Sequence, residues 1–322
     1  MKLQLLVPQY KEDENMVGVL LDSLALQQGV DLNEVEVVIV NDGTDVKLSN
    51  EFIDSYPFKI TYIYAPHGGV SATRNIALQA AEADYVMFCD ADDMFLNNCG
   101  VWLIFNEIEK GEFDAFISPF SEETCSNGKR NYISHPNTDG TFVHGKVYRR
   151  QFLLNKHIFW DKDLTIHEDS YFNYLARVNV AKDKLRLGKD VFYLWKYRPD
   201  SVCRTQQDWI VKSYTHMIKS TEHLVDELLR RGLMEYAKEA SMNLIYRTYF
   251  QANTDAWNKE ENREYAEADM KAFREYYKKY GPVADLLDEK KKNELWHIIR
   301  EQAYKEGTVF MKITFHDWVA SL

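Results

Sequence analysis

The chain has 322 residues, of which 45% are hydrophobic and 28% are charged, and its formal net charge is −11. These are the values of a folded globular protein, and they exclude a chain that is disordered throughout. The negative charge excludes attraction to nucleic acid or to an anionic membrane by a general electrostatic field. The length predicts two units, one of them a full α/β domain with a large core.

The cysteines and the apolar segments indicate the compartment. No C-x-x-C spacing is present, so we expect reduced thiols rather than a disulfide framework or a zinc site; the cysteines are Cys89, Cys99, Cys125 and Cys203. The apolar run before Pro8 is too short for a secretion signal, and no stretch approaches the roughly 18 apolar residues of a spanning helix. We therefore expect a soluble, cytoplasmic protein.

Strands and helices are predicted to alternate over the first part of the chain. Apolar runs predict strands over residues 3–7, 35–40, 60–64 and 85–89. Apolar residues at helical spacing predict one helix from Asp13 to near Gly29 and another over residues 76–81. This order predicts an α/β fold with a doubly wound, mostly parallel, Rossmann-like sheet. Ligands of such sheets bind beyond the carboxyl ends of the strands, where Gln9, Asp42 and Asp90 stand.

An acidic stretch follows the fourth predicted strand. Three carboxylates, those of Asp90, Asp92 and Asp93, stand within four consecutive positions. Neighbouring carboxylates repel each other and raise each other's pKa, so a divalent cation would stabilise them. A cation held by one or two carboxylates also suits the phosphates of a nucleotide. The alternative is a solvated turn that caps a helix, because Asp is favoured at both kinds of position.

The remainder begins as an α/β pattern and ends as helices. A helix is predicted over 101–110, a strand over 113–117, and a loop over 121–140, which is rich in Ser, Asn, Gly, Thr and Pro. Residues 142–150 predict a strand that runs into a helix, and residues 191–197 predict another strand. From Gln207 onward the pattern is helical, with one helix over 210–228. We therefore predict two domains, residues 1–205 and a helical C-terminal region of residues 206–322.

Six short blocks give the first domain a family resemblance. They are Val7-Pro8-Gln9-Tyr10-Lys11, Val40-Asn41-Asp42-Gly43-Thr44-Asp45, Gly69-Val70-Ser71-Ala72-Thr73-Arg74-Asn75, Asp90-Ala91-Asp92-Asp93, Glu168-Asp169 and Tyr197-Arg198-Pro199-Asp200-Ser201. In this order they resemble the motifs of the family 2 glycosyltransferases, although Asn41 stands where that family usually has Asp. The resemblance covers residues 1–205, and it implies a GT-A fold and transfer of a sugar from a nucleotide donor with inversion.

The resemblance implies where a nucleotide sugar would bind. Asp42 would accept a hydrogen bond from a uracil-type base, and that ring would be flanked by Tyr10 through stacking and by Arg74 through a cation–π contact or a hydrogen bond. Asp90 would face the ribose and the sugar, and Arg198 would reach the diphosphate. The residues predicted to contact the donor are Pro8, Tyr10, Glu12, Asp42, Arg74, Asp90, Ala91 and Arg198.

The resemblance also implies a metal ligand and a catalytic base. Asp92, the second Asp of a D-x-D motif, would bind Mn²⁺ or Mg²⁺, which acts as a Lewis acid on the departing diphosphate. Asp169 would take the proton of the acceptor hydroxyl as general base, with Glu168 as the alternative. His144 and His167 are each either a further metal ligand or diphosphate donor, or a structural histidine.

The expected function is that of a metal-dependent, inverting hexosyltransferase. It would move a sugar from a UDP-sugar to a hydroxyl group of a polysaccharide, a protein or a modified nucleobase. A non-catalytic nucleotide-sugar-binding or scaffold protein is one alternative, although such a protein needs no base. A nucleotidyltransferase is another, because that class also uses carboxylate-bound metal. The helical region would bind the acceptor or pair two subunits in a homo-oligomer, and the sequence leaves both roles open.

Overall fold

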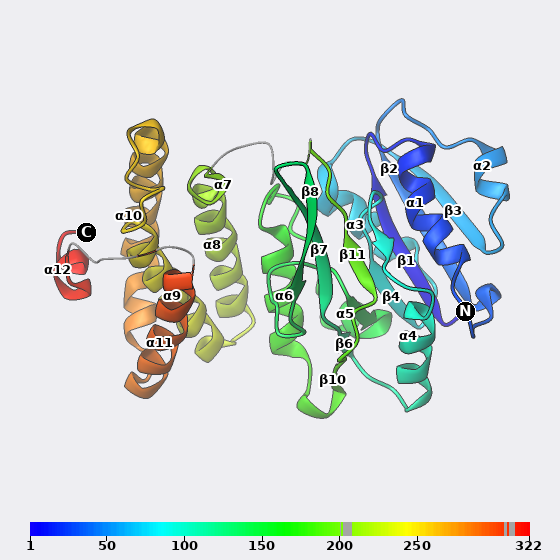
Figure 1. Cartoon of the computed structure of the whole chain (residues 1–322). Helices are drawn as coiled ribbons and strands as arrows, with labels where there is room; N and C mark the ends of the chain where they lie inside the picture. Colours follow the sequence, from blue (N-terminus) through cyan, green and yellow to red (C-terminus); the bar gives the residue numbers. More distant parts are fainter. Residues whose placement is uncertain (200, 202–207, 306–307, 309–312) are drawn as a thin grey trace. The chain divides into compact units, whose positions relative to one another are not determined.

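The structure is a computed structural model, and it describes residues 1–199, 201, 208–305, 308 and 313–322. The chain forms two compact units, Met1–Pro199 and Asp200–Leu322. The predicted domain boundary after residue 205 and the cysteine Cys203 lie outside the described residues. Figure 1 shows that the first unit contains the sheets and that helices make up the described part of the second.

A seven-stranded sheet forms the centre of the first unit, with its strands in the order β10-β6-β9-β4-β1-β2-β3. Neighbouring strands run parallel, except that β9 is antiparallel to both β4 and β6. The strands are β1 (Leu3–Gln9), β2 (Val35–Asp42), β3 (Lys59–Ala65), β4 (Tyr85–Phe88), β6 (Ala115–Ile117), β9 (Lys146–Arg149) and β10 (Leu185–Leu187). The predicted α/β fold with a mostly parallel sheet is thus confirmed.

Helices cover both faces of this sheet, which is why its central strands are almost wholly apolar. The helices of the first unit are α1 (Glu14–Ala25), α2 (Asn50–Asp54), α3 (Gly69–Ala80), α4 (Gly100–Glu109), α5 (Arg150–Asn155) and α6 (Glu168–Asn179). Apolar residues of α1 and α4 share one core with alternate residues of β1 and β2. On the other face, α3 packs on β1 and β2, and Phe88 of β4 lies against the rings of Trp160 and Phe172.

Helix α1 is shorter than the sequence predicted, because it ends at Ala25 rather than near Gly29. Beyond its end, the backbone N–H of Gln28 donates to the carbonyl of Asn98 at 2.8 Å. The side-chain amide of Gln27 likewise donates to the carbonyl of Asn97 at 2.6 Å. These bonds take donors away from the helix and fasten its end to the loop before α4.

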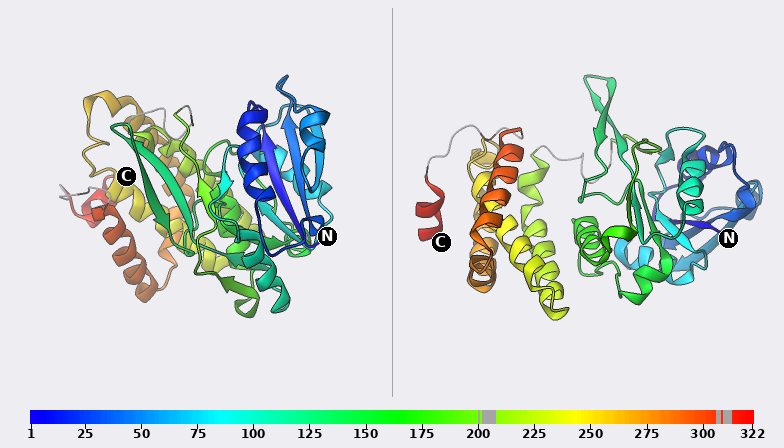
Figure 2. Two further views of the ribbon diagram at one scale, coloured as in Figure 1. Left: turned by 45° about the vertical axis from the view of Figure 1, so that its right-hand side comes forward. Right: turned by 90° about the horizontal axis from the view of Figure 1, so that it is seen from below.

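Residues 121–140, predicted as a loop, contain a β-hairpin instead. Strands β7 (Phe120–Ser126) and β8 (Lys129–His135) pair in antiparallel fashion. The two residues between them, Asn127 and Gly128, have φ angles of 51° and 73°, as a type I′ turn requires. This Asn-Gly pair is a strong hairpin signal, and the polar composition of the segment obscured it. With β5 (Met94–Phe95) and β11 (Tyr193–Trp195) the hairpin forms a sheet of order β5-β11-β7-β8 (Figure 2).

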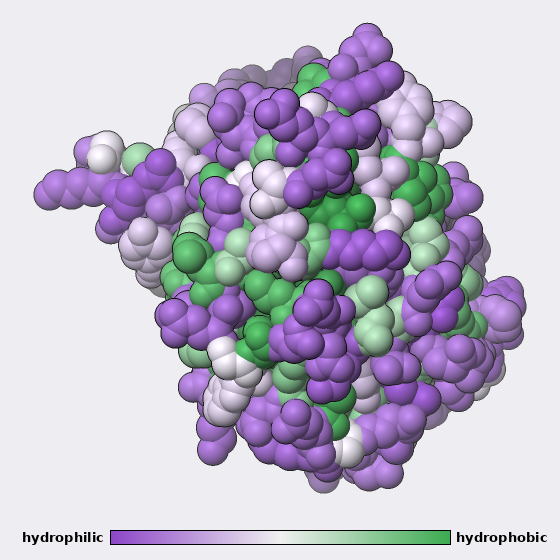
Figure 3. Space-filling model, turned by 90° about the vertical axis from the view of Figure 1, so that its right-hand side faces the viewer, coloured by the Kyte–Doolittle hydropathy of each residue, from purple (hydrophilic) through white to green (hydrophobic). Residues whose placement is uncertain are grey.

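Strand β3 is an edge of the seven-stranded sheet, and lysines cover that edge. Lys59, whose side chain is 64% exposed, pairs with Glu36 of β2 at 2.8 Å. The ammonium of Lys47 lies 5.0 Å from the ring centre of the exposed Tyr64. Hydrophilic side chains also cover most of this side of the molecule, with hydrophobic ones scattered between them (Figure 3). Charged side chains at an edge strand hinder pairing with a second sheet.

The second unit consists of helices over its described residues. They are α7 (Trp209–Lys212), α8 (Tyr214–Arg230), α9 (Met234–Gln251), α10 (Arg263–Asp285), α11 (Glu289–Lys305) and α12 (Phe315–Ala320). The helix predicted over 210–228 is divided at Ser213, whose hydroxyl donates to the carbonyl of Trp209 at 2.8 Å and so disturbs the helical ladder. Within the described residues, no helix has both the length and the hydropathy that crossing a membrane requires.

A buried acid stands inside this helical unit. Asp269 of α10 is only 2% exposed, and the hydroxyl of Thr215 of α8 donates to its Oδ1. Its Oδ2 has no hydrogen-bond partner among the described residues. Burial therefore raises the pKa of Asp269 to about 6.

Candidate active site

The acidic turn after β4 is fixed in place by strand β11. The hydroxyl of Tyr193 accepts a hydrogen bond from the backbone N–H of Asp90 at 3.1 Å and donates to Oδ2 of Asp93 at 2.7 Å. The backbone N–H of Lys196 donates to Oδ1 of the same carboxyl group at 2.9 Å. Asp93 is fully buried, whereas the side chains of Asp90 and Asp92 are 32% and 26% exposed. The turn therefore presents two accessible carboxylates over a buried third one.

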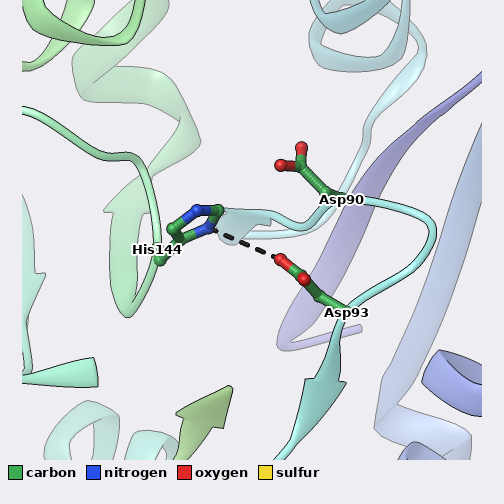
Figure 4. Close-up of side chains that lie close together, drawn as sticks. All are labelled: Asp90, Asp93 and His144. Atoms are coloured by element: carbon green, nitrogen blue, oxygen red, sulfur yellow. Dashed lines mark ion pairs between the residues drawn. The ribbon is translucent and has the colours of Figure 1, made fainter. Parts of the chain in front are cut away.

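Two side chains of this turn and a histidine that precedes β9 form a three-residue cluster that could hold a divalent cation. One ligand atom each from Asp90, Asp93 and His144 lies within 4.8 Å of the other two. Nδ1 of His144 is 3.7 Å from Oδ2 of Asp93, and Figure 4 shows the imidazole turned toward that carboxylate. Burial lowers the pKa of His144, so the ring is neutral and able to coordinate a metal. Two carboxylates and one imidazole suit Mn²⁺, and the residues present therefore fit the metal that the family resemblance implies.

The charge of the turn supports the same conclusion. Burial and repulsion by Asp90 raise the pKa of Asp92 to about 6. Burial and the neighbouring Asp90 and Asp92 raise the pKa of Asp93 well above its ordinary value. A bound cation would relieve this excess of negative charge. Asp92, the predicted metal ligand, is not in the three-residue cluster, since its Oδ2 lies 3.0 Å from Nη1 of Arg198.

Arg74 of α3 joins the acidic turn to the first turn of α6. Its guanidinium donates to Asp90 at 2.8 Å, to Glu168 at 3.1 Å and to Asp169 at 2.7 Å. Arg74 is only 3% exposed, and its Cζ is 4.3 Å from the ring centre of Trp160. Burial opposes its charge, but the three carboxylates outweigh burial and raise the pKa of the guanidinium. The sequence placed Arg74 beside a nucleobase, whereas the structure places it at the centre of the carboxylates.

Both oxygens of Asp169 are held by hydrogen bonds. Oδ1 accepts from Arg74, and Oδ2 accepts from the backbone N–H of Val143 at 3.0 Å. The carboxyl group of Glu168 lies beside it, and burial together with repulsion by Asp169 raises the pKa of Glu168. His167, the other histidine left open by the sequence, is the N-cap residue of α6 with a φ of 62°, outside the three-residue cluster.

The predicted base-binding end of the site lies at the carboxyl end of β2. The carboxylate of Asp42 accepts hydrogen bonds from the backbone N–H groups of Gly68 at 2.7 Å and Gly69 at 3.0 Å. Nδ1 of His67 lies 2.9 Å from the same carboxylate, and its ring stacks on the exposed ring of Tyr10 with centres 5.1 Å apart. His67 was missed because it carries no motif of its own.

The structure explains why Asn41 stands where the family usually has Asp. Its side-chain amide donates to Oε1 of Gln9 at 3.0 Å, to the carbonyl of Val46 at 2.9 Å and to the hydroxyl of Tyr62 at 3.0 Å. Its carbonyl oxygen accepts from the backbone N–H of Thr44 at 2.9 Å. An ionised Asp has no N–H to donate, so Asn41 supports the loop after β2 in a way that Asp does not.

Arg198 and Glu12, two more of the residues predicted to contact the nucleotide sugar, form an ion pair with each other. Nη1 of Arg198 lies 2.9 Å from Oε1 of Glu12 and 3.0 Å from Oδ2 of Asp92. Oε2 of Glu12 accepts from the backbone N–H of Tyr10 at 2.8 Å. The segment after β11 is thereby tied to the turns after β1 and β4. Of the other two predicted residues, Pro8 lies in β1 opposite Val40, and Ala91 is buried within the acidic turn.

His135 of β8 joins the two strands of the β7–β8 hairpin to each other and to Asp139. The ring of His135 stacks on Phe120 with centres 4.4 Å apart. Its Nε2 lies 3.0 Å from Glu122, and its Nδ1 lies 3.4 Å from Asp139. The hydrogen bonds to Asp139 and Glu122 raise the pKa of His135 to about 9, so the imidazole is charged at neutral pH.

A mostly parallel α/β sheet with carboxylates beyond its carboxyl edge fits the GT-A fold of the glycosyltransferases that the resemblance implied. The sequence profile described as Glycosyl transferase family 2 matches residues 5–178, which is more than half of the chain. The chain therefore belongs to glycosyl transferase family 2, and the predicted family is confirmed.

Curated relatives are similar over part of their length. An uncharacterized glycosyltransferase, EpsJ of Bacillus subtilis, is 25% identical over 224 residues, which are 62% of this chain and 62% of that protein. The poly(ribitol-phosphate) β-N-acetylglucosaminyltransferase TarS of Staphylococcus aureus is 27% identical over 216 residues, which are 61% of this chain and 36% of TarS. The chain thus spans less than two thirds of each relative.

Solved structures show the same fold. S. aureus TarS 1-349 in complex with UDP-GlcNAc superposes with a TM-score of 0.65 at 18% identity, over 95% of this chain and 93% of that chain. The mannosyltransferase PcManGT of Pyrobaculum calidifontis, in complex with GDP-Man and Mn²⁺, gives a TM-score of 0.51 at 16% identity, over 94% and 83%. At these identities the likeness concerns the fold alone.

Proposed function

We propose that this protein is an inverting glycosyltransferase that moves a sugar from a UDP-sugar to an acceptor hydroxyl with the help of Mn²⁺ or Mg²⁺. The observation that carries the proposal is the group of carboxylates around Arg74, which brings Asp90 of the acidic turn within reach of Glu168 and Asp169. Acids from the donor side and the acceptor side of a reaction thus lie together in one site.

In this proposal Asp169 is the general base. Its carboxylate accepts the proton of the acceptor hydroxyl while that oxygen bonds to the anomeric carbon and the bond from carbon to diphosphate breaks. A single displacement of this kind inverts the anomeric centre. The choice of Asp169 is supported by the two hydrogen bonds that orient its carboxylate, from Arg74 and from the N–H of Val143, and Glu168 is the alternative base.

The donor is proposed to lie across the carboxyl ends of β1, β2 and β4. Tyr10, Asp42 and His67 would meet the base, and Asp90 would meet the ribose and the sugar. Arg198 would exchange its contacts with Glu12 and Asp92 for the diphosphate. A cation held by Asp90, Asp93 and His144, or by Asp92 as the sequence predicts, would balance the charge of the leaving diphosphate.

The relatives suggest which substrates to test first. One structure with this fold was solved with UDP-GlcNAc, which makes that sugar nucleotide the first donor to try. Several relatives are named for work on teichoic acids or poly(ribitol-phosphate), so a hydroxyl-rich polymer is the first acceptor class. The helical unit is proposed either to bind that acceptor or to pair two subunits.

The test is release of UDP from a panel of UDP-sugars, with Mn²⁺ or with EDTA, followed by mass spectrometry. We expect one donor to be hydrolysed slowly, and we expect Asp169→Asn to lower transfer by about 10²- to 10⁴-fold. Asp183→Asn, at an exposed position, is the matched control and should leave the rate unchanged. If no nucleotide sugar is bound or turned over, a non-catalytic role replaces the proposed one.

Variants of the acidic turn can distinguish the two candidate sets of metal ligands. Mn²⁺ binding is measured by electron paramagnetic resonance on the wild type, Asp92→Asn and Asp93→Asn. Loss of Mn²⁺ binding in Asp93→Asn alone would favour the three-residue cluster as the metal site. Loss of Mn²⁺ binding in Asp92→Asn would favour Asp92, the ligand predicted from the sequence. Undiminished Mn²⁺ binding by both variants would place the metal elsewhere.

A further inference from the structure

One peptide group, that between Phe142 and Val143, is held from both of its ends. Its N–H donates to Oδ2 of Asp169 at 3.0 Å. Its C=O accepts hydrogen bonds from Nζ of Lys146 and, at 2.9 Å, from Nδ2 of Asn173. Val143, Lys146 and Asn173 are all buried. The peptide group therefore lies directly between a buried ammonium and the carboxylate proposed as the base.

Burial lowers the pKa of Lys146 to about 8, although the charges of Asp139 and Asp169 favour its ammonium form. Lys146 is 2% exposed, and within the described part of the chain no carboxylate lies within ion-pair distance of its ammonium. A buried ammonium without a paired carboxylate is unfavourable, whereas a methionine would fill a similar volume without that penalty. Asn173 already provides a neutral donor to the same carbonyl. The extra charge is thus not needed merely to satisfy the backbone.

The local backbone directs Lys146 toward this carbonyl. Gly145 has a φ of 68°, and a Cβ at that position would lie 2.8 Å from the carbonyl oxygen of Ser118. Only glycine fits there without strain. The turn at Gly145 leads into β9, whose first residue is Lys146, so that the side chain reaches back to Phe142.

The alignment has an electrostatic consequence for Asp169. A peptide group is a dipole whose positive end is its N–H, and a positive charge at its oxygen polarises it further in the same sense. The N–H of Val143 thereby becomes a stronger donor to the carboxylate of Asp169. Arg74 holds the other oxygen of that carboxylate at 2.7 Å, so both oxygens are bound by positively polarised donors. The two hydrogen bonds hold the carboxylate in one orientation.

We propose that Lys146 is a positioning residue for Asp169, acting through the peptide group between Phe142 and Val143. The proposal rests on the proposed function in one respect, namely that Asp169 is the base. Its role is to orient the carboxylate of the base through the N–H of Val143.

The test compares variants at Lys146 with a matched neighbour. Lys146→Met removes the charge and the donor, Lys146→Gln keeps a donor without charge, and Lys146→Arg keeps the charge. Tyr148→Phe is the control, because it removes a hydrogen bond of 3.2 Å to Oδ1 of Asn173 without changing any charge near the Phe142 carbonyl. If Lys146→Met does not fold, Lys146→Gln carries the same comparison.

We expect Lys146→Met and Lys146→Gln to lower kcat by about 10- to 100-fold with little change in the KM for the donor. The acidic limb of the pH–rate profile should move to higher pH, because a weaker hydrogen bond from the N–H of Val143 favours the carboxylate less. Lys146→Arg should restore part of the rate, and Tyr148→Phe should leave the limb in place. An unmoved limb in both neutral variants would overturn the proposal.

A second readout does not depend on catalysis. In protein labelled with ¹⁵N-valine, the amide proton of Val143 reports the strength of its hydrogen bond to Asp169. Lys146→Gln and Asp169→Asn should both shift this resonance upfield, whereas Tyr148→Phe should not. If the wild type proves inactive but the shift is seen, the proposed function fails and the coupling stands. If the shift is absent in an active enzyme, the coupling fails alone.

Discussion

Replacement of Arg74 by methionine tests the centre of the site. The guanidinium binds three carboxylates at 2.7 to 3.1 Å and is 3% exposed, so its removal leaves these acids without their countercharge. Removing one partner of a buried ion pair costs about 3–5 kcal/mol. Asp90 is 32% exposed, and the raised pKa of Glu168 means that this group carries less charge. We therefore expect Arg74→Met to lose an unfolding free energy near the lower end of this range, about 3 kcal/mol at pH 7.5.

The loss should depend on pH. Burial would raise the pKa of Asp90, but Arg74 outweighs it, so the pKa is lowered in the folded protein. A group with a lowered pKa stabilises the fold above its unfolded pKa of about 3.9, and the stabilisation is lost as the pH falls through the folded value. The difference between wild type and Arg74→Met should therefore be largest at neutral pH and shrink below pH ~4.

Urea unfolding followed by tryptophan fluorescence measures this difference. Arg74→Lys should recover only part of the loss, because a single ammonium cannot reproduce the planar fork that meets three acids. Arg177→Met, at an exposed position of α6, is the control and should change stability by no more than about 0.5 kcal/mol. A loss below about 1 kcal/mol, or one that is the same at pH 3.5 and pH 7.5, would refute the view that Arg74 neutralises these acids.

Two further predictions concern groups with raised pKa values. His135 has a pKa of about 9, so its ion pairs with Asp139 and Glu122 stabilise the fold fully below pH ~6.5 and fade as the pH rises through 9. His135→Gln should lower stability by about 3 kcal/mol at pH 6, and urea titrations should show this charge-dependent part vanish by pH ~10. Asp269 has a pKa of about 6, so its ionisation destabilises the fold as the pH rises from about 4 to about 6, and the loss is complete above that range. Asp269→Asn should raise the melting temperature at pH 7.5 and not at pH 3.5, and equal effects at both would contradict the reasoning.

The parts of the fold that depend on local pattern could be predicted from the sequence. Continuous apolar runs mark β1, β2 and β4 because strands covered on both faces have no polar side to show. Where polar signals were mixed with turn residues, the sequence was misread. The Asn127–Gly128 pair marks a hairpin, but the surrounding Ser and Thr suggested a loop. The end of α1 was misplaced because partners outside the helix, the carbonyls of Asn97 and Asn98, decide it.

The candidate site, like the fold, could be predicted only in part from the sequence. The acids of the turn after β4 and the pair at the start of α6 were found because each stands at the end of an element, in a recognisable order. The ion pairs of Arg74 with Glu168 and Asp169 were not predicted, since these partners stand 94 and 95 positions further along the chain. His67 and Lys146 carried no signal at all, because neither belongs to a motif.

The sequence by itself determined the family, the order of the first strands and helices, and the edge of the sheet at which the candidate functional residues gather. Only the tertiary structure decided which charges meet: Arg74 with three acids, Arg198 with Glu12 and Asp92, and Lys146 with the peptide group that holds Asp169. The physical reason is that strand and helix formation follow from the spacing of neighbouring residues, whereas these charge contacts, apart from the local one from Lys146 to Phe142, join residues far apart in the chain. The partners of Arg74 are set by the packing of α3 and α6 on the sheet, and those of Arg198 by the meeting of the loops after β1, β4 and β11.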